Sequence, residues 1–177
     1  MKKKILFVGA SFAQVPPIKY AKKMGYYVVA CDQNKKSPGF KYCDESYIIS
    51  TTNKKKIYEL SKKLKINGII TYVSDTASPA VSYVAKKLNL KGLPIKAVNT
   101  LVYKNLFRKF LKKNNFNYPE FKIFRSKEKI NNFIDKIGYP FFIKPIDSSG
   151  SKGVTKVVKK IFIKKAISEA LNYSKKK

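Results

Sequence analysis

Residues 139–153 have the sequence Tyr-Pro-Phe-Phe-Ile-Lys-Pro-Ile-Asp-Ser-Ser-Gly-Ser-Lys-Gly. An apolar run of strand length ends at Lys144 and leads into a loop of small residues. Gly150 and Gly153 allow positive φ and close approach of the backbone, and Lys152 adds a mobile charge. Glycine and serine are also ordinary turn residues, so a surface hairpin is the alternative. The lysine before the loop favours a polyphosphate-binding loop.

The pattern around this loop predicts a C-terminal half of α+β type. Its expected elements are a basic helix over Leu101–Asn114, a strand over Glu120–Phe124, a helix from Ser126 to Ile137 that Gly138 ends, a strand over Phe141–Lys144, a returning strand over Val154–Val158 and a terminal helix from about Ile163. Two strands joined through the loop form an antiparallel pair. Residues 101–177 are therefore expected to form one domain, a partial one, and residues 1–100 another.

The N-terminal half alternates short apolar runs with helical patterns. We expect strands over Ile5–Val8, Tyr26–Cys31, Tyr47–Ile49 and Gly68–Val73, and helices from Pro16 to Gly25, over Asn53–Leu64 and from about Ser78 to Leu88. Fully apolar strands that alternate with helices indicate a parallel sheet. The predicted fold class is α/β, with a Rossmann-like first domain.

Polar residues follow three of these predicted strands. In an open α/β sheet the carboxyl ends of the strands line the ligand crevice. We expect this crevice to bind a substrate through Gly9, Ala10, Ser11, Asp32, Ser74, Asp75 and Thr76. Two structural alternatives stay open: Asp32 caps the adjoining loop, and Asp75 is a helix N-cap together with its neighbours.

The same crevice raises the question of a dinucleotide. The glycine fingerprint for NAD needs three glycines, and the segment from Gly9 to Gln14 supplies only the first. Asp32 lies at the position of the acidic residue that binds the ribose in such a fingerprint. An NAD(P)-dependent oxidoreductase of Rossmann type is therefore an alternative function.

The charge of the chain is extreme: 39 basic and 10 acidic residues give +29. This balance alone would indicate nucleic acid or an anionic surface. Only Arg108 and Arg125 are arginines, and the abundance of Lys, Asn, Ile, Phe and Tyr is typical of an A/T-rich genome. Sequence-specific readers of nucleic acid use arginine forks, so we expect no specific nucleic-acid partner.

Histidine is absent, which excludes Ser-His and Cys-His nucleophiles and histidine zinc sites. The two cysteines, Cys31 and Cys43, lie outside any metal-type spacing and suit a reducing compartment. Apolar runs are of strand length, so neither a signal peptide nor a membrane span is expected. We expect a soluble cytoplasmic protein without a metal site of its own.

Three segments resemble the ATP-grasp superfamily of ligases. They are Tyr-Lys-Asn-Leu-Phe-Arg-Lys-Phe-Leu at 103–111, Gly-Tyr-Pro-Phe-Phe-Ile-Lys-Pro at 138–145, and the loop over 147–154. The N-terminal βαβ unit is similar to the domain that precedes ATP-grasp in the carbamoyl phosphate synthase large subunit, biotin carboxylase and the purine-synthesis carboxylases or transformylases. The order and spacing of these segments span nearly the whole chain.

The resemblance implies an ATP site and a reaction class. ATP would phosphorylate a small-molecule carboxylate, and an amine or similar nucleophile would displace the phosphate. The residues that the resemblance assigns to ATP are Lys104, Lys144, Ser148, Ser149, Gly150, Ser151, Lys152 and Gly153. Lys144 ends an apolar strand and is expected to need a partner there. No catalytic residue is assigned.

The chain departs from the family pattern after Gly153. In the family, the acidic residues and the asparagine that bind Mg²⁺ come later, and Glu169 is the only later carboxylate side chain here. We therefore expect a truncated or split ligase that is inactive alone and a second chain that completes it. A non-catalytic nucleotide-binding module is the remaining alternative.

Overall fold

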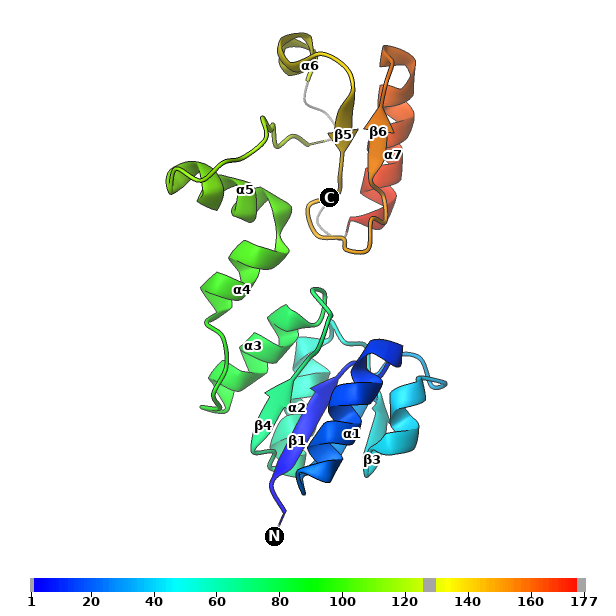
Figure 1. Ribbon diagram of the computed structural model, residues 1–177, viewed down its shortest axis with the longest axis vertical. Helices are drawn as coiled ribbons and strands as arrows, with labels where there is room; N and C mark the ends of the chain where they lie inside the picture. Colours follow the sequence, from blue (N-terminus) through cyan, green and yellow to red (C-terminus); the bar gives the residue numbers. More distant parts are fainter. Residues whose placement is uncertain (1, 126–129, 175–177) are drawn as a thin grey trace. The chain divides into compact units, whose positions relative to one another are not determined.

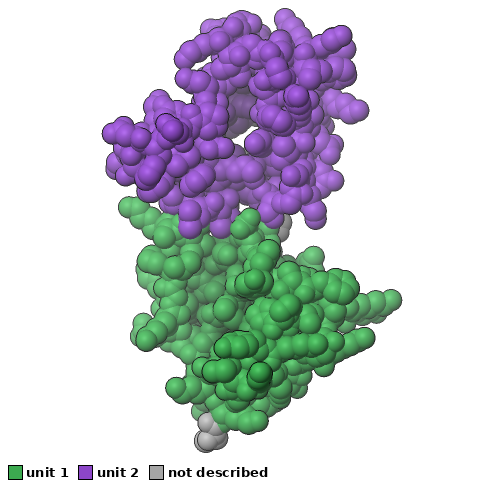
Figure 2. All heavy atoms as spheres, viewed as in Figure 1, with its two compact units in different colours: residues 1–99 green, residues 100–177 purple. Residues whose placement is uncertain are grey.

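The computed structural model describes residues 2–125 and 130–174. It divides into two compact units, residues 1–99 (unit 1) and residues 100–177 (unit 2) (Figure 2). The boundary falls inside helix α4 (Ile95–Val102). Each unit has its own sheet, so each is described separately.

Unit 1 is built on a parallel sheet with strand order β3-β2-β1-β4 (Figure 1). The strands are β1 (Lys4–Val8), β2 (Tyr27–Asp32), β3 (Glu45–Ile48) and β4 (Gly68–Ile70), and the helices are α1 (Val15–Lys23), α2 (Lys54–Leu64) and α3 (Ser78–Lys87). Short 3-10 turns lie at Phe12–Gln14 and Pro38–Tyr42. The predicted βαβ alternation and the α/β class are confirmed.

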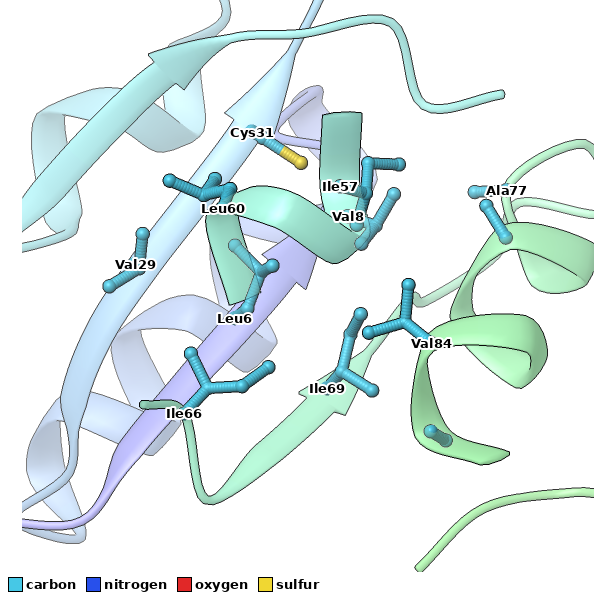
Figure 3. Close-up of a cluster of buried hydrophobic side chains, with 12 residues drawn as sticks. Leu6, Val8, Val29, Cys31, Ile57, Leu60, Ile66, Ile69, Ala77 and Val84 are labelled. Atoms are coloured by element: carbon cyan, nitrogen blue, oxygen red, sulfur yellow. The ribbon is translucent and has the colours of Figure 1, made fainter. Parts of the chain in front are cut away.

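Each face of the unit 1 sheet has its own core. Leu6 and Val8 point to one face, where Ile57 of α2 and Val84 of α3 pack against them (Figure 3). Phe7 lies between these two residues in the strand and belongs to the second cluster, with residues of α1 such as Ile18. The period of two along a strand sends neighbouring side chains to opposite faces. Helices on both faces explain why the central strands β1 and β2 are apolar along most of their length.

Unit 2 has a two-stranded antiparallel sheet. Its elements are α5 (Lys104–Lys113), α6 (Asn131–Ile137), β5 (Phe141–Ile143), β6 (Thr155–Val157), a 3-10 turn at Lys160–Phe162 and α7 (Ile163–Tyr173). Ile143 pairs with Thr155, and the buried side chains of Ile143 and Val157 pack on Ala166 and Ala170 of α7. The antiparallel pair, the terminal helix and the end of α6 at Gly138 are confirmed.

Two predicted elements of unit 2 are wrong. The single helix expected over Leu101–Asn114 is two helices, because Tyr103 is extended at φ −88° and ψ 115°. Lys104 N donates to the Ile146 carbonyl at 3.0 Å, a tertiary bond that draws the chain out of the helix. Glu120–Phe124 alternates like a strand but pairs with no strand of the described residues. The predicted cap Ser126 lies outside the described residues.

In unit 1 the fourth strand ends earlier than expected. It stops at Ile70 instead of Val73, whose φ of 50° is left-handed. Thr71 turns its Oγ1 to the Val8 carbonyl at 2.8 Å, which holds the chain beside β1. Over the part of the chain that the structure describes, no helix has the length and apolar character needed to cross a bilayer.

We predict that Gly39→Ala destabilises the protein. Gly39 N donates to the Ala10 carbonyl at 2.7 Å, and an added Cβ would lie 2.7 Å from that oxygen and 2.9 Å from Ile18 Cδ1. The expected loss in the free energy of unfolding is about 1–3 kcal/mol, measured by denaturant titration. Gly68→Ala is the matched control, since its Cβ would meet Ile5 Cγ1 at an ordinary 3.7 Å. Equal stabilities of the two variants would contradict the close approach.

Candidate functional site

The loop after β1 and the end of β2 meet at the carboxyl edge of the unit 1 sheet. Ala10 N donates to Asp32 Oδ2 at 2.9 Å, and Asn34 N donates to Asp32 Oδ1 at 3.0 Å. Gly9 N donates to the Cys31 carbonyl at 2.8 Å. The structure thus brings the Gly9–Ser11 segment and Asp32 together. Both carboxylate oxygens hold backbone amides, which is the capping arrangement that the sequence left open.

Gln14 connects this loop to the segment after β4, and the sequence analysis missed it. Its side chain is 3% exposed. Its Oε1 accepts from Ser11 N at 2.9 Å and from Ser11 Oγ at 2.5 Å, while its Nε2 donates to the Tyr72 carbonyl. A glutamine just before two prolines carries no special local signal, because its partner is 58 positions away.

Ser74, Asp75 and Thr76 lie apart from this network. Within residues 2–125 and 130–174 no hydrogen bond joins them to Asp32. Asp75 is exposed, and the N-cap of α3 is Ala77, without a side-chain cap bond. The N-cap role considered for Asp75 is therefore wrong. The polar contact within the segment is between the hydroxyls of Ser74 and Thr76, at 3.5 Å.

Cys31 is the sulfur nearest to this edge, and it is not a nucleophile. Its side chain is fully buried between the strands. Burial, reinforced by the charge of Asp32, raises the pKa of the Cys31 thiol to about 12. Because the thiolate is the reactive form, thiol chemistry is suppressed here at neutral pH.

In unit 2 the first residue of α5 is bound to the glycine-rich loop. Lys104 Nζ donates to the Ser148 carbonyl, in addition to the backbone bond from Lys104 N to Ile146. The structure thus joins two predicted site residues that are 44 positions apart. Beside them, Asn105 Oδ1 is a buried acceptor without a donor among the described residues. The sequence analysis did not single out Asn105.

The loop between β5 and β6 is a compact bend with left-handed backbone. Gly150, Ser151 and Gly153 have φ of 63°, 57° and 71°. Ser148 Oγ donates to the Lys152 carbonyl at 3.1 Å, which closes the bend. A Cβ at Gly150 would meet no atom within 4 Å, so the backbone there is open to a ligand. This geometry suits anion binding by backbone amides.

Both ends of the bend are held by the C-terminal end of α7. Ser174 Oγ donates to Asp147 Oδ1 at 2.7 Å. At the other end, a Cβ on Gly153 would lie 3.0 Å from the side chain of Tyr173. The end of α7 therefore contacts both ends of the bend, whereas a Cβ at Gly150, near the tip, would lie in open space.

Lys144 differs from its expected setting. It follows the last residue of β5 and is exposed, with Nζ 5.2 Å from the centroid of the Phe142 ring. The expectation that it would need a partner is wrong, because an exposed ammonium is solvated. Over the described residues no hydrogen bond joins Lys144 Nζ to Lys104 or to the loop.

A groove of about 710 Å³ runs beside the loop, β6 and α7. Its basic lining residues are Lys152, Lys156 and Lys165, and its single acidic one is Glu169. Lys104 and Lys144 do not line it, so the groove lies on the α7 side of the loop. Among the described residues, no group of three acidic or cysteine side chains could hold a metal ion.

The chain is similar to known proteins in sequence and in fold. Residues 110–176 match the family model described as the D-ala D-ala ligase C-terminus. The chain is 25% identical over 182 residues to the formate-dependent phosphoribosylglycinamide formyltransferase of Prochlorococcus marinus MIT 9515, covering 100% of this chain and 46% of that protein.

Solved structures show the same fold. The N5-carboxyaminoimidazole synthetase of Staphylococcus aureus, complexed with ADP, has a TM-score of 0.77 at 19% identity, over 98% of this chain and 46% of its own. The biotin carboxylase domain of the Hydrogenobacter thermophilus 2-oxoglutarate carboxylase, in complex with MgADP and bicarbonate, has a TM-score of 0.78 at 19% identity, over 97% and 42%.

These comparisons confirm the resemblance to ATP-grasp ligases and the mixed α/β fold class. The chain spans less than half the length of these relatives. It aligns along nearly its whole length, so both units have their counterparts in those proteins.

We predict that Asp32→Ala destabilises the protein while Asp75→Ala does not. Removal of the Asp32 carboxylate leaves the amides of Ala10 and Asn34 without acceptors, whereas Asp75 is exposed. The expected losses in the free energy of unfolding are about 1–3 kcal/mol for Asp32 and under about 0.5 kcal/mol for Asp75. Chemical unfolding followed by circular dichroism measures both. A neutral Asp32 variant would show that the carboxylate does not hold the loop.

Proposed function

We propose that this chain, a relative of the ATP-grasp ligases over nearly its whole length, forms the ATP-binding portion of such a ligase. The observation that carries the proposal is the bond between Lys104 Nζ and the Ser148 carbonyl. It places a helix lysine at the base of a glycine-rich bend, in a fold whose solved relatives hold ADP. A positive group beside open backbone amides is suited to a phosphate chain.

The residues of the bend fit a polyphosphate. The open backbone at Gly150 and the free tip of the loop let the amides of residues 148–153 turn toward phosphate oxygens. Lys152 and Lys144 are exposed ammonium groups on the loop and on the strand before it. We assign Lys104 and Lys144 to the α-phosphate side of ATP, and the loop with Lys152 to the β- and γ-phosphates.

ATP in this site would convert a small-molecule carboxylate into an acyl phosphate, which an amine or similar nucleophile then attacks. The contribution of this chain is to bind and orient the phosphates and to exclude water as the loop closes. Closure matters because water would hydrolyse an acyl phosphate. We place the carboxylate substrate at the edge formed by Gly9–Ser11, Asp32 and Ser74–Thr76.

We propose that Mg²⁺ accompanies ATP and takes its ligands from another polypeptide. Among the described residues, no cluster of three cysteine, aspartate or glutamate side chains could hold the ion. We propose that a second chain supplies these ligands and completes the ATP-grasp domain; this chain aligns with less than half of the length of its relatives. Both cysteines are free, which fits a cytoplasmic site of action.

We prefer the ligase to the NAD(P)-dependent oxidoreductase for a structural reason. Both oxygens of Asp32, the residue placed to bind a ribose, already accept backbone amides. A ribose hydroxyl would have to displace or share those bonds. In addition, a Rossmann-type dinucleotide site does not use a second loop like the glycine-rich bend of unit 2.

We predict that Lys144→Ala and Lys152→Ala each weaken the binding of ADP about tenfold. Each removes one charge-assisted bond to phosphate, and about 1.4 kcal/mol corresponds to a factor of ten in Kd. Isothermal titration of the purified chain with ADP measures the effect. Lys164→Ala on α7 is the matched control, since Lys164 is exposed in the same unit and does not line the groove.

Two results would overturn the proposal. One is that the wild-type chain fails to bind ADP at millimolar concentration. The other is that all three variants lose affinity equally, as a general loss of positive charge would produce. Turnover of ATP after addition of the second chain separates a ligase portion from a non-catalytic nucleotide-binding module.

A further inference from the structure

The groove beside β6 and α7 has the size of a small-molecule site. Its volume is about 710 Å³, and ligand pockets in proteins span about 300–1,000 Å³. One wall is the chain from Ser151 through β6 to Val158, and the other is one side of α7 (Figure 1). All of its lining residues belong to unit 2. One compact unit therefore forms the whole groove.

The α7 wall carries an aromatic ring at each end. Phe162, Ala166, Glu169 and Tyr173 follow one another at intervals of three or four residues, which places them on one side of the helix. Phe162 and Tyr173 are 42% and 47% exposed, so the protein covers each side chain only in part. Ala166 between them is buried and keeps the floor apolar. The wall thus offers apolar surface to a ligand.

Two lysines at the groove have no acidic partner. Lys152 on the loop and Lys165 on α7 are exposed lining residues, and within residues 2–125 and 130–174 no salt bridge involves either of them. Glu169, one helical turn beyond Lys165, has no salt bridge there either. Lys156 also lines the groove, but the side chain of the next residue, Val157, packs on α7. Alternation along β6 therefore directs the Lys156 side chain to the other face of the sheet.

The groove is distinct from the nucleotide site proposed above. Neither Lys104 nor Lys144 lines it. Ile143 packs on α7, so the next residue, Lys144, leaves the chain on the side away from that helix. The two sites share only the end of the loop, residues 151–153.

We propose that this groove is a second ligand site, which binds a small organic phosphate with an aromatic body. A doubly charged phosphate matches the two ammonium groups of Lys152 and Lys165, because charge-assisted hydrogen bonds are the strong ones in proteins. Phe162 and Tyr173 supply the apolar contact for the ring. Glu169 limits the ligand to one anionic group, since a polyanion laid along the groove would bring negative charge against this carboxylate.

The first experiment titrates phenyl phosphate, a simple member of this class, into the purified full chain. Binding is followed by broadening of the ligand's NMR signals. We expect phenyl phosphate to bind at least about tenfold more tightly than inorganic phosphate, because only the former adds a ring that packs on the apolar wall.

Matched pairs of variants locate the bound probe. Lys165→Gln should weaken the binding of phenyl phosphate at least about fivefold, through loss of one charge-assisted bond. Lys164→Gln makes the same change at the adjacent exposed residue, which does not line the groove, and should have less than about a twofold effect.

The second pair tests the apolar wall. Phe162→Ser should weaken binding at least about fivefold, whereas Ile161→Ser, at a residue that is 78% exposed and outside the groove, should have less than about a twofold effect. Circular dichroism reports whether each variant folds. Lys165 is exposed, so the lysine pair decides the question if Phe162→Ser unfolds.

Several results would overturn the second site. They are binding of phenyl phosphate no tighter than that of inorganic phosphate, equal effects of Lys164→Gln and Lys165→Gln, and equal effects of a folded Phe162→Ser and Ile161→Ser. Displacement of phenyl phosphate by saturating ADP would also overturn it, because the probe would then occupy the nucleotide site.

The two sites fail separately. Lys144→Ala should weaken ADP and leave phenyl phosphate bound, and Lys165→Gln should do the reverse. Lys152 is left out of this test because it belongs to both sites. A chain that binds phenyl phosphate in the groove but not ADP would sink the proposed function alone, and the opposite result would sink the second site alone.

Discussion

The hydrogen bonds that join Lys104 to Ile146 and Ser148 are the constraint on which unit 2 depends. Its backbone N donates to Ile146 at 3.0 Å, and its Nζ donates to the Ser148 carbonyl. Lys104 is therefore the first residue of α5 after the break at Tyr103, and it also holds the base of the glycine-rich bend. The helix and the loop cannot be placed independently of each other. Because the ammonium is held at a carbonyl, a positive charge already stands beside the loop before any ligand arrives.

The two units use their polar groups in different ways. At the sheet edge of unit 1, the side chains of Asp32 and Gln14 form hydrogen bonds with backbone groups of the surrounding loops. These bonds fix the loops after β1, β2 and β4. In unit 2, Lys144 and Lys152 are exposed, and α7 holds the loop only at its ends, through Ser174 and Tyr173. A rigid edge suits recognition of a small substrate, and a loop with a free tip suits closure over phosphates.

Local patterns were sufficient to predict the parallel βαβ unit, the antiparallel pair and the bend at Gly150 and Gly153, because burial patterns and turn residues act over a few positions. Three features emerged only from the folded chain: Tyr103 breaks a helix, Gln14 bridges two loops, and Lys144 is solvated and needs no partner. Glu120–Phe124 has the alternation of a strand but no neighbour to pair with. The break at Tyr103 and the bridge by Gln14 depend on contacts between residues tens of positions apart, such as Lys104 with Ser148 and Gln14 with Tyr72, which no local pattern records.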